Sequence, residues 1–154
     1  LSPDFPLTVP VSDFVIFDED ADNSEILSTM NGTIEQELDG IVIEFEYSLT
    51  SKAKSELNSY TAGTQTYNDV IPVEMTLGLK ITAKLEFQGI PIEYPVMTQQ
   101  DVVTSVQYYA NGIGMVHAVT DITYNLEETP GFELPVPQSA TQHVEEILAD
   151  YSVE

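Results

Sequence analysis

Residues 71–87 alternate between apolar and mostly polar or small side chains at every position. A period of two is typical of a β-strand with one buried and one solvated face. At about 3.3 Å per residue the run would extend for more than about 50 Å, which is too long for one flat strand in a small domain. We therefore expect a bend or bulge at Gly78, and a sheet that curls around its core. The apolar positions are Ile71, Val73, Met75, Leu77, Leu79, Ile81, Ala83, Leu85 and Phe87.

The rest of the chain supplies further strands for this sheet. Asp39-Gly40 is a two-residue turn signal between two alternating runs. Pro91 and Pro95 cannot donate to hydrogen-bond ladders on both sides, so the strand that carries them should lie at an edge. The expected strands are residues 13–17, 33–38, 41–49, 71–87, 90–97, 102–110 and 115–126, of which 13–17 and 90–97 should lie at an edge. The expected connections are residues 26–32, 50–63, 98–101 and 111–114. The first of them ends in a turn at Asn31-Gly32, the second has room for a helical turn at 53–57, and the last is a turn.

The two ends of the chain read differently. Residues 1–12 contain three prolines and predict an extended arm, which we expect along an edge of the sheet. Residues 128–154 predict a Pro-rich connector followed by a helix at 140–151, with a capping box and one apolar stripe. The fold class is therefore mainly β: a single curled antiparallel sheet or half-barrel with a short C-terminal helix, in one domain over residues 1–154. The capping box is Ser139 and Gln142, and the stripe is Val144, Ile147, Leu148 and Tyr151.

The charge is strongly negative. There are 26 acidic residues against four lysines and no arginine, which gives a formal net charge of −22. Such a surface repels phosphate backbones and anionic membranes, so we expect no nucleic-acid partner. No stretch is long and apolar enough to predict a transmembrane segment. Solubility in a salty or extracellular medium, attraction of divalent cations and steering of a basic partner all remain open explanations of the acidity.

One acidic loop resembles a calcium loop in its spacing. Asp18, Asp20 and Asp22 stand at alternate positions, as calcium-binding loops require. The match to an EF-hand fails at its sixth position, Asn23, and at its twelfth, Thr29. A solvated acidic loop is the simpler interpretation, and these three residues stay the only metal candidates.

The inventory for catalysis is thin. Cysteine is absent, and the two histidines are His117, in a strand, and His143, in the expected helix. Asp121 is four residues along the strand from His117, about 13 Å away, so the two cannot form a triad contact. Thr104 and Ser105 are the hydroxyls expected in the neighbouring strand. We therefore predict no enzyme, no catalytic residue and no cofactor.

One stretch carries a family resemblance. Tyr108-Tyr109-Ala110-Asn111-Gly112-Ile113-Gly114-Met115-Val116 resembles the aromatic-Ala-x-Gly-Val-Gly-Leu-Val hairpin of exported bacterial lipoproteins of unknown function. Residues 63–70 are similar to the Gly-Thr-x-Tyr/Phe turn that precedes a long strand in those proteins. His117 stands where that family usually has Lys, and Met115 where it often has Leu. The resemblance covers residues 60–127 and implies a curled sheet of the LolA-like half-barrel type, without known catalytic residues.

These observations favour a non-enzymatic domain of the cell envelope. The resemblance implies an exported protein, periplasmic or at the cell surface, which is lipid-anchored in its full-length form. Its partner would be an unknown protein or an apolar ligand. A carrier of a lipid in a half-barrel cavity is the first alternative, because a curled sheet with an apolar face can hold such a ligand. A hydrolase is the second alternative.

Overall fold

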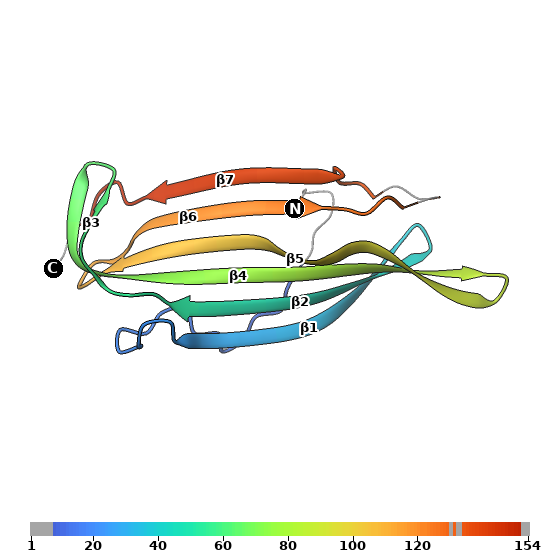
Figure 1. The fold of residues 1–154 in the computed structure, drawn as a ribbon, viewed down its shortest axis with the longest axis horizontal. Helices are drawn as coiled ribbons and strands as arrows, with labels where there is room; N and C mark the ends of the chain where they lie inside the picture. Colours follow the sequence, from blue (N-terminus) through green and yellow to red (C-terminus); the bar gives the residue numbers. More distant parts are fainter. Residues whose placement is uncertain (1–7, 130, 132–133, 152–154) are drawn as a thin grey trace.

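The computed structural model describes residues 8–129, 131 and 134–151, and these residues form one open antiparallel sheet of seven strands (Figure 1). The mainly β, antiparallel prediction is confirmed. Along the sheet the order is β1-β2-β4-β5-β6-β7, and β3 pairs with the first part of β4. The strands are β1 (Ile26–Leu38), β2 (Ile41–Ala53), β3 (Leu57–Ala62), β4 (Gln65–Phe87), β5 (Ile90–Ala110), β6 (Gly114–Asn125) and β7 (Ser139–Ile147).

The first hairpin forms where the sequence predicts it. β1 and β2 pair from Leu38 and Ile41 outward around Asp39-Gly40. Both turn residues have positive φ, 51° and 80°, as a type I′ turn requires. Asn31-Gly32, expected as a turn, instead lies inside β1, because Gly32 leaves room for the ring of Tyr47 on the facing strand.

The long alternating run is the centre of the sheet. β4 extends the predicted strand back to Gln65, and its register with β5 shifts at Leu77/Gly78, where a bend or bulge was expected. Leu79, Ile81 and Ala83 of this strand belong to the main core, with Leu79 and Ala83 fully buried, and Leu77 packs against it. This core cluster consists of Ile43, Phe45, Tyr47, Leu79, Ile81, Ala83, Val96, Met97, Val102 and Tyr124.

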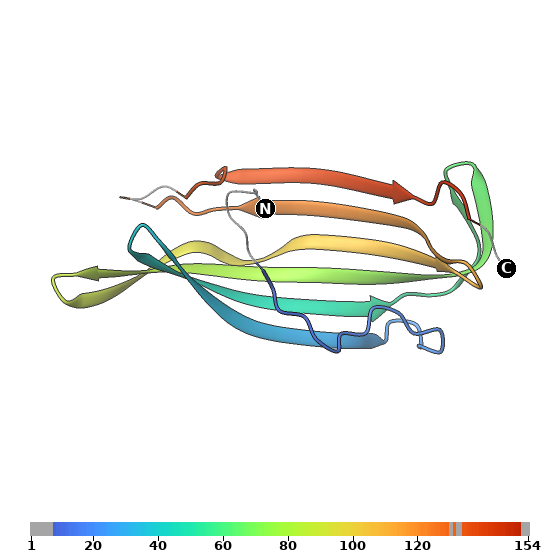
Figure 2. The same cartoon turned by 180° about the vertical axis from the view of Figure 1, so that it is seen from behind.

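Residues 8–24 cross this apolar face (Figure 2). Val15 donates its amide to Ser28 Oγ (2.9 Å) and accepts a bond from Ser51 Oγ (2.5 Å). The predicted edge strand at 13–17 is wrong, because Val15 bonds to serine side chains rather than to a neighbouring strand. Of the predicted arm, residues 1–7 lie outside the described part of the chain.

The predicted C-terminal helix is wrong. Its residues form β7, which pairs antiparallel with β6 from His117↔Ile147 to Asn125↔Ser139. Val144 and Ile147 of the expected stripe are β-branched and also favour a strand, and pairing with the open edge of β6 satisfies backbone groups along it. Ser139 therefore begins a strand and caps no helix.

Two connections were also mispredicted. Residues 98–101 continue β5 instead of forming a loop, and the register shifts there accommodate the irregular pairing with β4. Residues 53–57 hold no helical turn: β2 runs to Ala53 and β3 begins at Leu57. The edge prediction for 90–97 agrees with the pairing, since among the described strands this part of β5 pairs with β4 alone.

Candidate functional site

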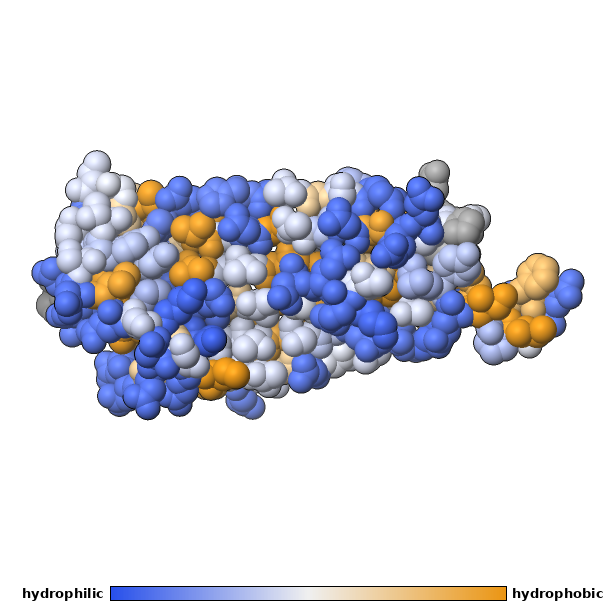
Figure 3. All heavy atoms as spheres, in the orientation of Figure 1, coloured by the Kyte–Doolittle hydropathy of each residue, from blue (hydrophilic) through white to orange (hydrophobic). Residues whose placement is uncertain are grey.

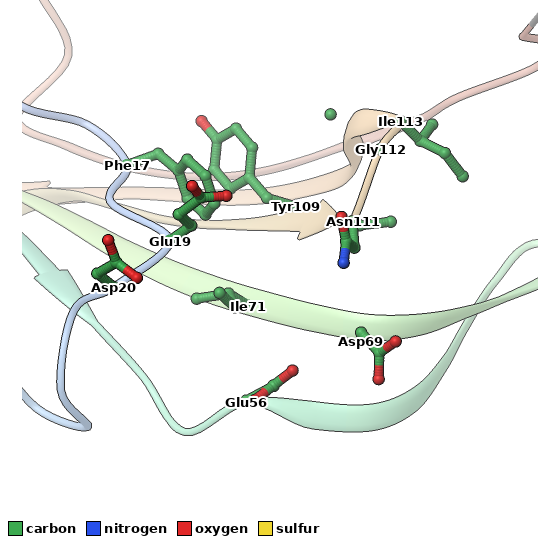
Figure 4. Close-up of a pocket in the computed structure, with 12 residues that line it drawn as sticks. Phe17, Glu19, Asp20, Glu56, Asp69, Ile71, Tyr109, Asn111, Gly112 and Ile113 are labelled. Atoms are coloured by element: carbon green, nitrogen blue, oxygen red, sulfur yellow. The ribbon is translucent and has the colours of Figure 1, made fainter. Parts of the chain in front are cut away.

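A cavity of about 490 Å³ lies beside the turn between β5 and β6 (Figure 4). Its walls come from the crossing N-terminal segment, the β2–β3 connection, β4 and the turn itself. It is lined by Phe17, Glu19, Asp20, Glu56, Asp69, Ile71, Tyr109, Ala110, Asn111, Gly112, Ile113 and Gly114. The volume falls in the range of small-molecule sites.

The turn is held in place by its backbone. The Asn111 amide donates to the Asp69 carbonyl of β4 (3.2 Å), and the Ile113 amide donates to the Ala110 carbonyl (3.1 Å). Gly112 and Gly114 have φ of 72° and 104°, where a side chain would be strained. The glycines thus serve backbone conformation, as the sequence indicates, and the adjoining register shift lies at Tyr108/Tyr109.

An aromatic pair forms part of the cavity wall. The rings of Phe17 and Tyr109 are stacked, with centroids 4.5 Å apart and an angle of 27° between their planes. The Tyr109 hydroxyl donates to Gln107 Oε1 (2.6 Å), which fixes the ring. Burial raises the pKa of the Tyr109 hydroxyl, so the ring stays a neutral phenol. Phe17 keeps 36% of its surface exposed.

Four carboxylates line the same cavity: Glu19, Asp20, Glu56 and Asp69. None of their side-chain oxygens accepts a hydrogen bond or an ion pair from the described residues, and no lysine or histidine lines the cavity. Figure 4 shows the four side chains spread around the cavity. Among residues 8–129, 131 and 134–151, no three acidic or imidazole groups lie close enough together to hold one metal ion.

The three calcium candidates have local roles in the described loop. Asp18 Oδ1 accepts the Asp20 amide (3.0 Å), and the Asp22 amide donates to Glu25 Oε2 (2.8 Å). Asp20 also lines the cavity, whereas Asp18 and Asp22 do not. The solvated acidic loop stays the prediction for this segment, with Asp18, Asp20 and Asp22 as the metal candidates.

His117 is at the centre of a second polar cluster, on the opposite face of the sheet. The residue is 7% exposed, and its two ring nitrogens lie 2.7 Å from Tyr60 Oη and 2.7 Å from Glu145 Oε1. A neutral ring that donates from Nε2 to Glu145 and accepts the Tyr60 hydroxyl at Nδ1 satisfies all three groups. Tyr60 stacks on Tyr108 with centroids 4.1 Å apart, and burial raises the pKa of its hydroxyl. The cluster joins β3 to β6 and β7.

The other residues weighed for catalysis are separate from His117. His143 Nδ1 lies 2.6 Å from Asp121 Oδ1, at the solvent-exposed face of β6 and β7. This hydrogen bond and the charge of Asp121 raise the pKa of His143. Ser105 Oγ lies 2.8 Å from Thr120 Oγ1, and no bond joins it to a histidine. Within the described residues Ser105 therefore has no histidine beside it to act as its base; the hydroxyl beside His117 is the phenol of Tyr60.

Over the main core the apolar face of the sheet is covered by side chains. Leu126, Leu134 and Val136 pack onto the main core, and the space left beside Phe45 and Met97 is about 20 Å³. Only about one water molecule would fit there.

The β4–β5 hairpin projects beyond the neighbouring strands and carries an apolar tip (Figures 1 and 3). Ile90 and Phe87 are the most exposed large apolar side chains among the described residues, at 62% and 61%. They face each other across the hairpin, next to the pair Leu85↔Ile92, so four apolar side chains share one face of the tip.

Comparisons with protein-family models, with curated proteins and with solved structures found no match. In the part of the chain that is described, no helix is long and apolar enough to cross a membrane.

Sequence reasoning singled out the turn of this site but missed the site itself. Asp20 was noted for calcium and Tyr109 for the family resemblance; Phe17 and Asp69 were noted only within an expected strand and within that resemblance, and Glu56 was not noted at all. They belong to three segments that only the fold brings together. The alternation of β4 and the turn at 111–114 were the available signals, and neither indicates which loops surround the turn.

Proposed function

We propose that this chain is a non-enzymatic binding or interaction module of the cell envelope, and that its ligand binds in the cavity beside the β5–β6 turn. The observation that carries the proposal is the cavity itself: an open space of about 490 Å³ with a stacked aromatic pair and four carboxylates that have no partner in the described protein. Concave sites with an apolar wall and a few polar groups are the usual form of binding sites. Export and lipid anchoring rest on the resemblance of residues 108–116 to exported lipoproteins.

The two alternatives have less support. A half-barrel carrier needs an empty space over the main core, and side chains leave about 20 Å³ there beside Phe45 and Met97. A serine-type hydrolase needs a histidine beside a serine or threonine hydroxyl, and the hydroxyl beside His117 is instead the phenol of Tyr60, which is stacked on Tyr108. Binding at the cavity requires neither condition.

The proposal is tested by recording ¹H–¹⁵N spectra of residues 1–154 with a mixed panel of cationic, neutral, anionic and fatty-acid ligands. We expect at least one ligand to shift the amides of 109–114 and to be recovered unchanged. Asn111→Trp, which places an indole at the rim, should abolish the shifts. Asn125→Trp, on an exposed position at the far end of β6, is the matched control and should leave them intact.

Three outcomes would contradict the proposal. Shifts centred on Phe45 and Met97 with a fatty acid would favour the carrier. Chemical conversion of a panel member would favour an enzyme. A panel without any ligand that shifts 109–114 would remove the support for binding at this cavity.

A further inference from the structure

The electrostatics of the cavity select the charge of its ligand. Its four carboxylates come from three separate segments, and the protein neutralises none of them within the described residues. Three of the four lysines form ion pairs elsewhere: Lys54 with Glu74, Lys80 with Glu46, and Lys84 with Glu35 and Glu44. A concave site lined by charges of one sign concentrates counter-ions of the other sign. Its ligand should therefore be a cation.

The aromatic wall selects the kind of cation. Phe17 offers a partly exposed ring that is fixed from behind by its stack on Tyr109. The face of an aromatic ring attracts ammonium and guanidinium groups, and its area also receives their apolar carbon atoms. This wall is an observation independent of the carboxylates, and a bare metal ion would make no use of it.

The size and spacing of the site point the same way. A space of about 490 Å³ is far larger than one ion. Among the described residues, no three acidic side chains lie close enough together to coordinate one metal ion. A ligand with its charge on a bulky or extended organic group can approach several separated carboxylates together with the ring of Phe17. Each carboxylate would then act as a hydrogen-bond acceptor or counter-charge.

We infer that the cavity beside the β5–β6 turn binds an organic cation, an alkylammonium or guanidinium group that contacts Phe17 and is neutralised by Glu19, Asp20, Glu56 and Asp69. The inference rests on the proposed function, since it names the ligand class of the same cavity. The group has two possible sources, a free amine or a basic side chain of a partner protein, and they share this chemistry.

The experiment titrates residues 1–154 with four probes, measured by calorimetry and by ¹H–¹⁵N spectra. Choline and spermidine represent free amines, a capped tri-lysine peptide represents a basic side chain, and glutamate is the anionic control. We expect saturable binding of at least one cationic probe at one site, with shifts at 109–114, and no binding of glutamate. Tighter binding of the peptide than of both amines assigns the group to a partner protein, and the reverse order assigns it to a free amine.

Two variants and one control identify the groups responsible. Glu19→Gln with Glu56→Gln should weaken binding about tenfold, and Phe17→Ala about three- to tenfold. Glu37→Gln with Glu86→Gln removes the same charge from exposed positions outside the cavity and should leave the affinity within about twofold. Urea unfolding of each variant confirms that it is folded before the affinities are compared.

Diffuse attraction to an acidic surface is the outcome that would overturn the inference most simply. It would appear as many weak sites, as shifts spread over the chain, or as equal losses in the cavity variant and the control. A neutral or anionic ligand that shifts 109–114 would also overturn the inference, yet would leave the proposed binding function standing. No ligand at 109–114 of any charge would refute both.

Discussion

The hydrogen bond between Tyr60 and His117 should contribute measurably to stability. Tyr60→Phe removes one oxygen atom and keeps the ring that stacks on Tyr108 at 4.1 Å. The substitution deprives the Nδ1 atom of His117 of its hydrogen-bond partner, and this residue is only 7% exposed. An unpaired buried polar atom costs more than the net value of the bond itself.

The magnitude follows from that distinction. An unsatisfied buried acceptor costs about 1–3 kcal/mol, and we expect the free energy of unfolding to fall by about 2 kcal/mol. In a domain of this size each 1 kcal/mol lowers the melting temperature by about 2–4 °C, so the midpoint should fall by about 4–8 °C. Because Tyr60 ties β3 to the sheet, the amides of Leu57–Ala62 should also exchange faster with solvent.

The assay is urea unfolding followed by circular dichroism, with hydrogen exchange as the local readout. Tyr151→Phe is the matched control, because its hydroxyl makes no hydrogen bond within the described residues and its side chain is 44% exposed. A double-mutant cycle with His117→Leu isolates the pair, since removing both partners leaves neither of them unpaired, and Glu145, whose side chain is 48% exposed, is then solvated by water. Equal costs for Tyr60→Phe and Tyr151→Phe, or strictly additive costs in the cycle, would refute the reasoning.

Three further predictions concern other parts of the sheet. Gly32→Ala should cost about 1–3 kcal/mol in urea unfolding, because a Cβ would lie 2.6 Å from Tyr47 Cζ; a cost near zero would show that the ring has room to move. The pKa of His143 should lie above its ordinary 6.5 in an NMR titration and should fall in Asp121→Asn. The stability that this pair adds is complete below about pH 6.5 and is lost as the pH rises through the folded-state pKa. Identical titration curves of His143 in the parent and in Asp121→Asn would contradict the prediction. Phe87→Ser should leave the urea midpoint within about 0.5 kcal/mol of the parent, because the side chain is 61% exposed beyond the end of β2, and a larger loss would mean that the tip is covered.

The parts of the fold that could be predicted are those determined by neighbouring residues in the sequence. Asp39-Gly40 needs no distant partner to form a turn, and the alternation of residues 71–87 is dictated by one buried face. The predicted C-terminal helix is wrong because Val144 and Ile147 have the spacing of a helical stripe, while their β-branched side chains also favour a strand. The open edge of β6, which decides between the two, is a tertiary feature.

The same distinction explains the candidate site. The turn at 111–114 could be located from its glycines, but the carboxylates of Glu56 and Asp69 reach the cavity only after β3 and β4 have paired. Phe17 reaches it only because the N-terminal segment crosses the sheet face, held by the serines of β1 and β2. Long-range placement of this kind leaves no periodic trace in the sequence.

The central claim, that the cavity holds an organic cation against Phe17, is tested most directly by intermolecular NOEs. Choline is suited to the measurement because its methyl protons give one sharp signal. With choline added to residues 1–154, we predict NOEs from those methyl protons to the rings of Phe17 and Tyr109, and their loss in the cavity variant Glu19→Gln with Glu56→Gln. NOEs to other parts of the chain, or none to these two rings at choline concentrations that saturate the spectral shifts, would contradict the claim.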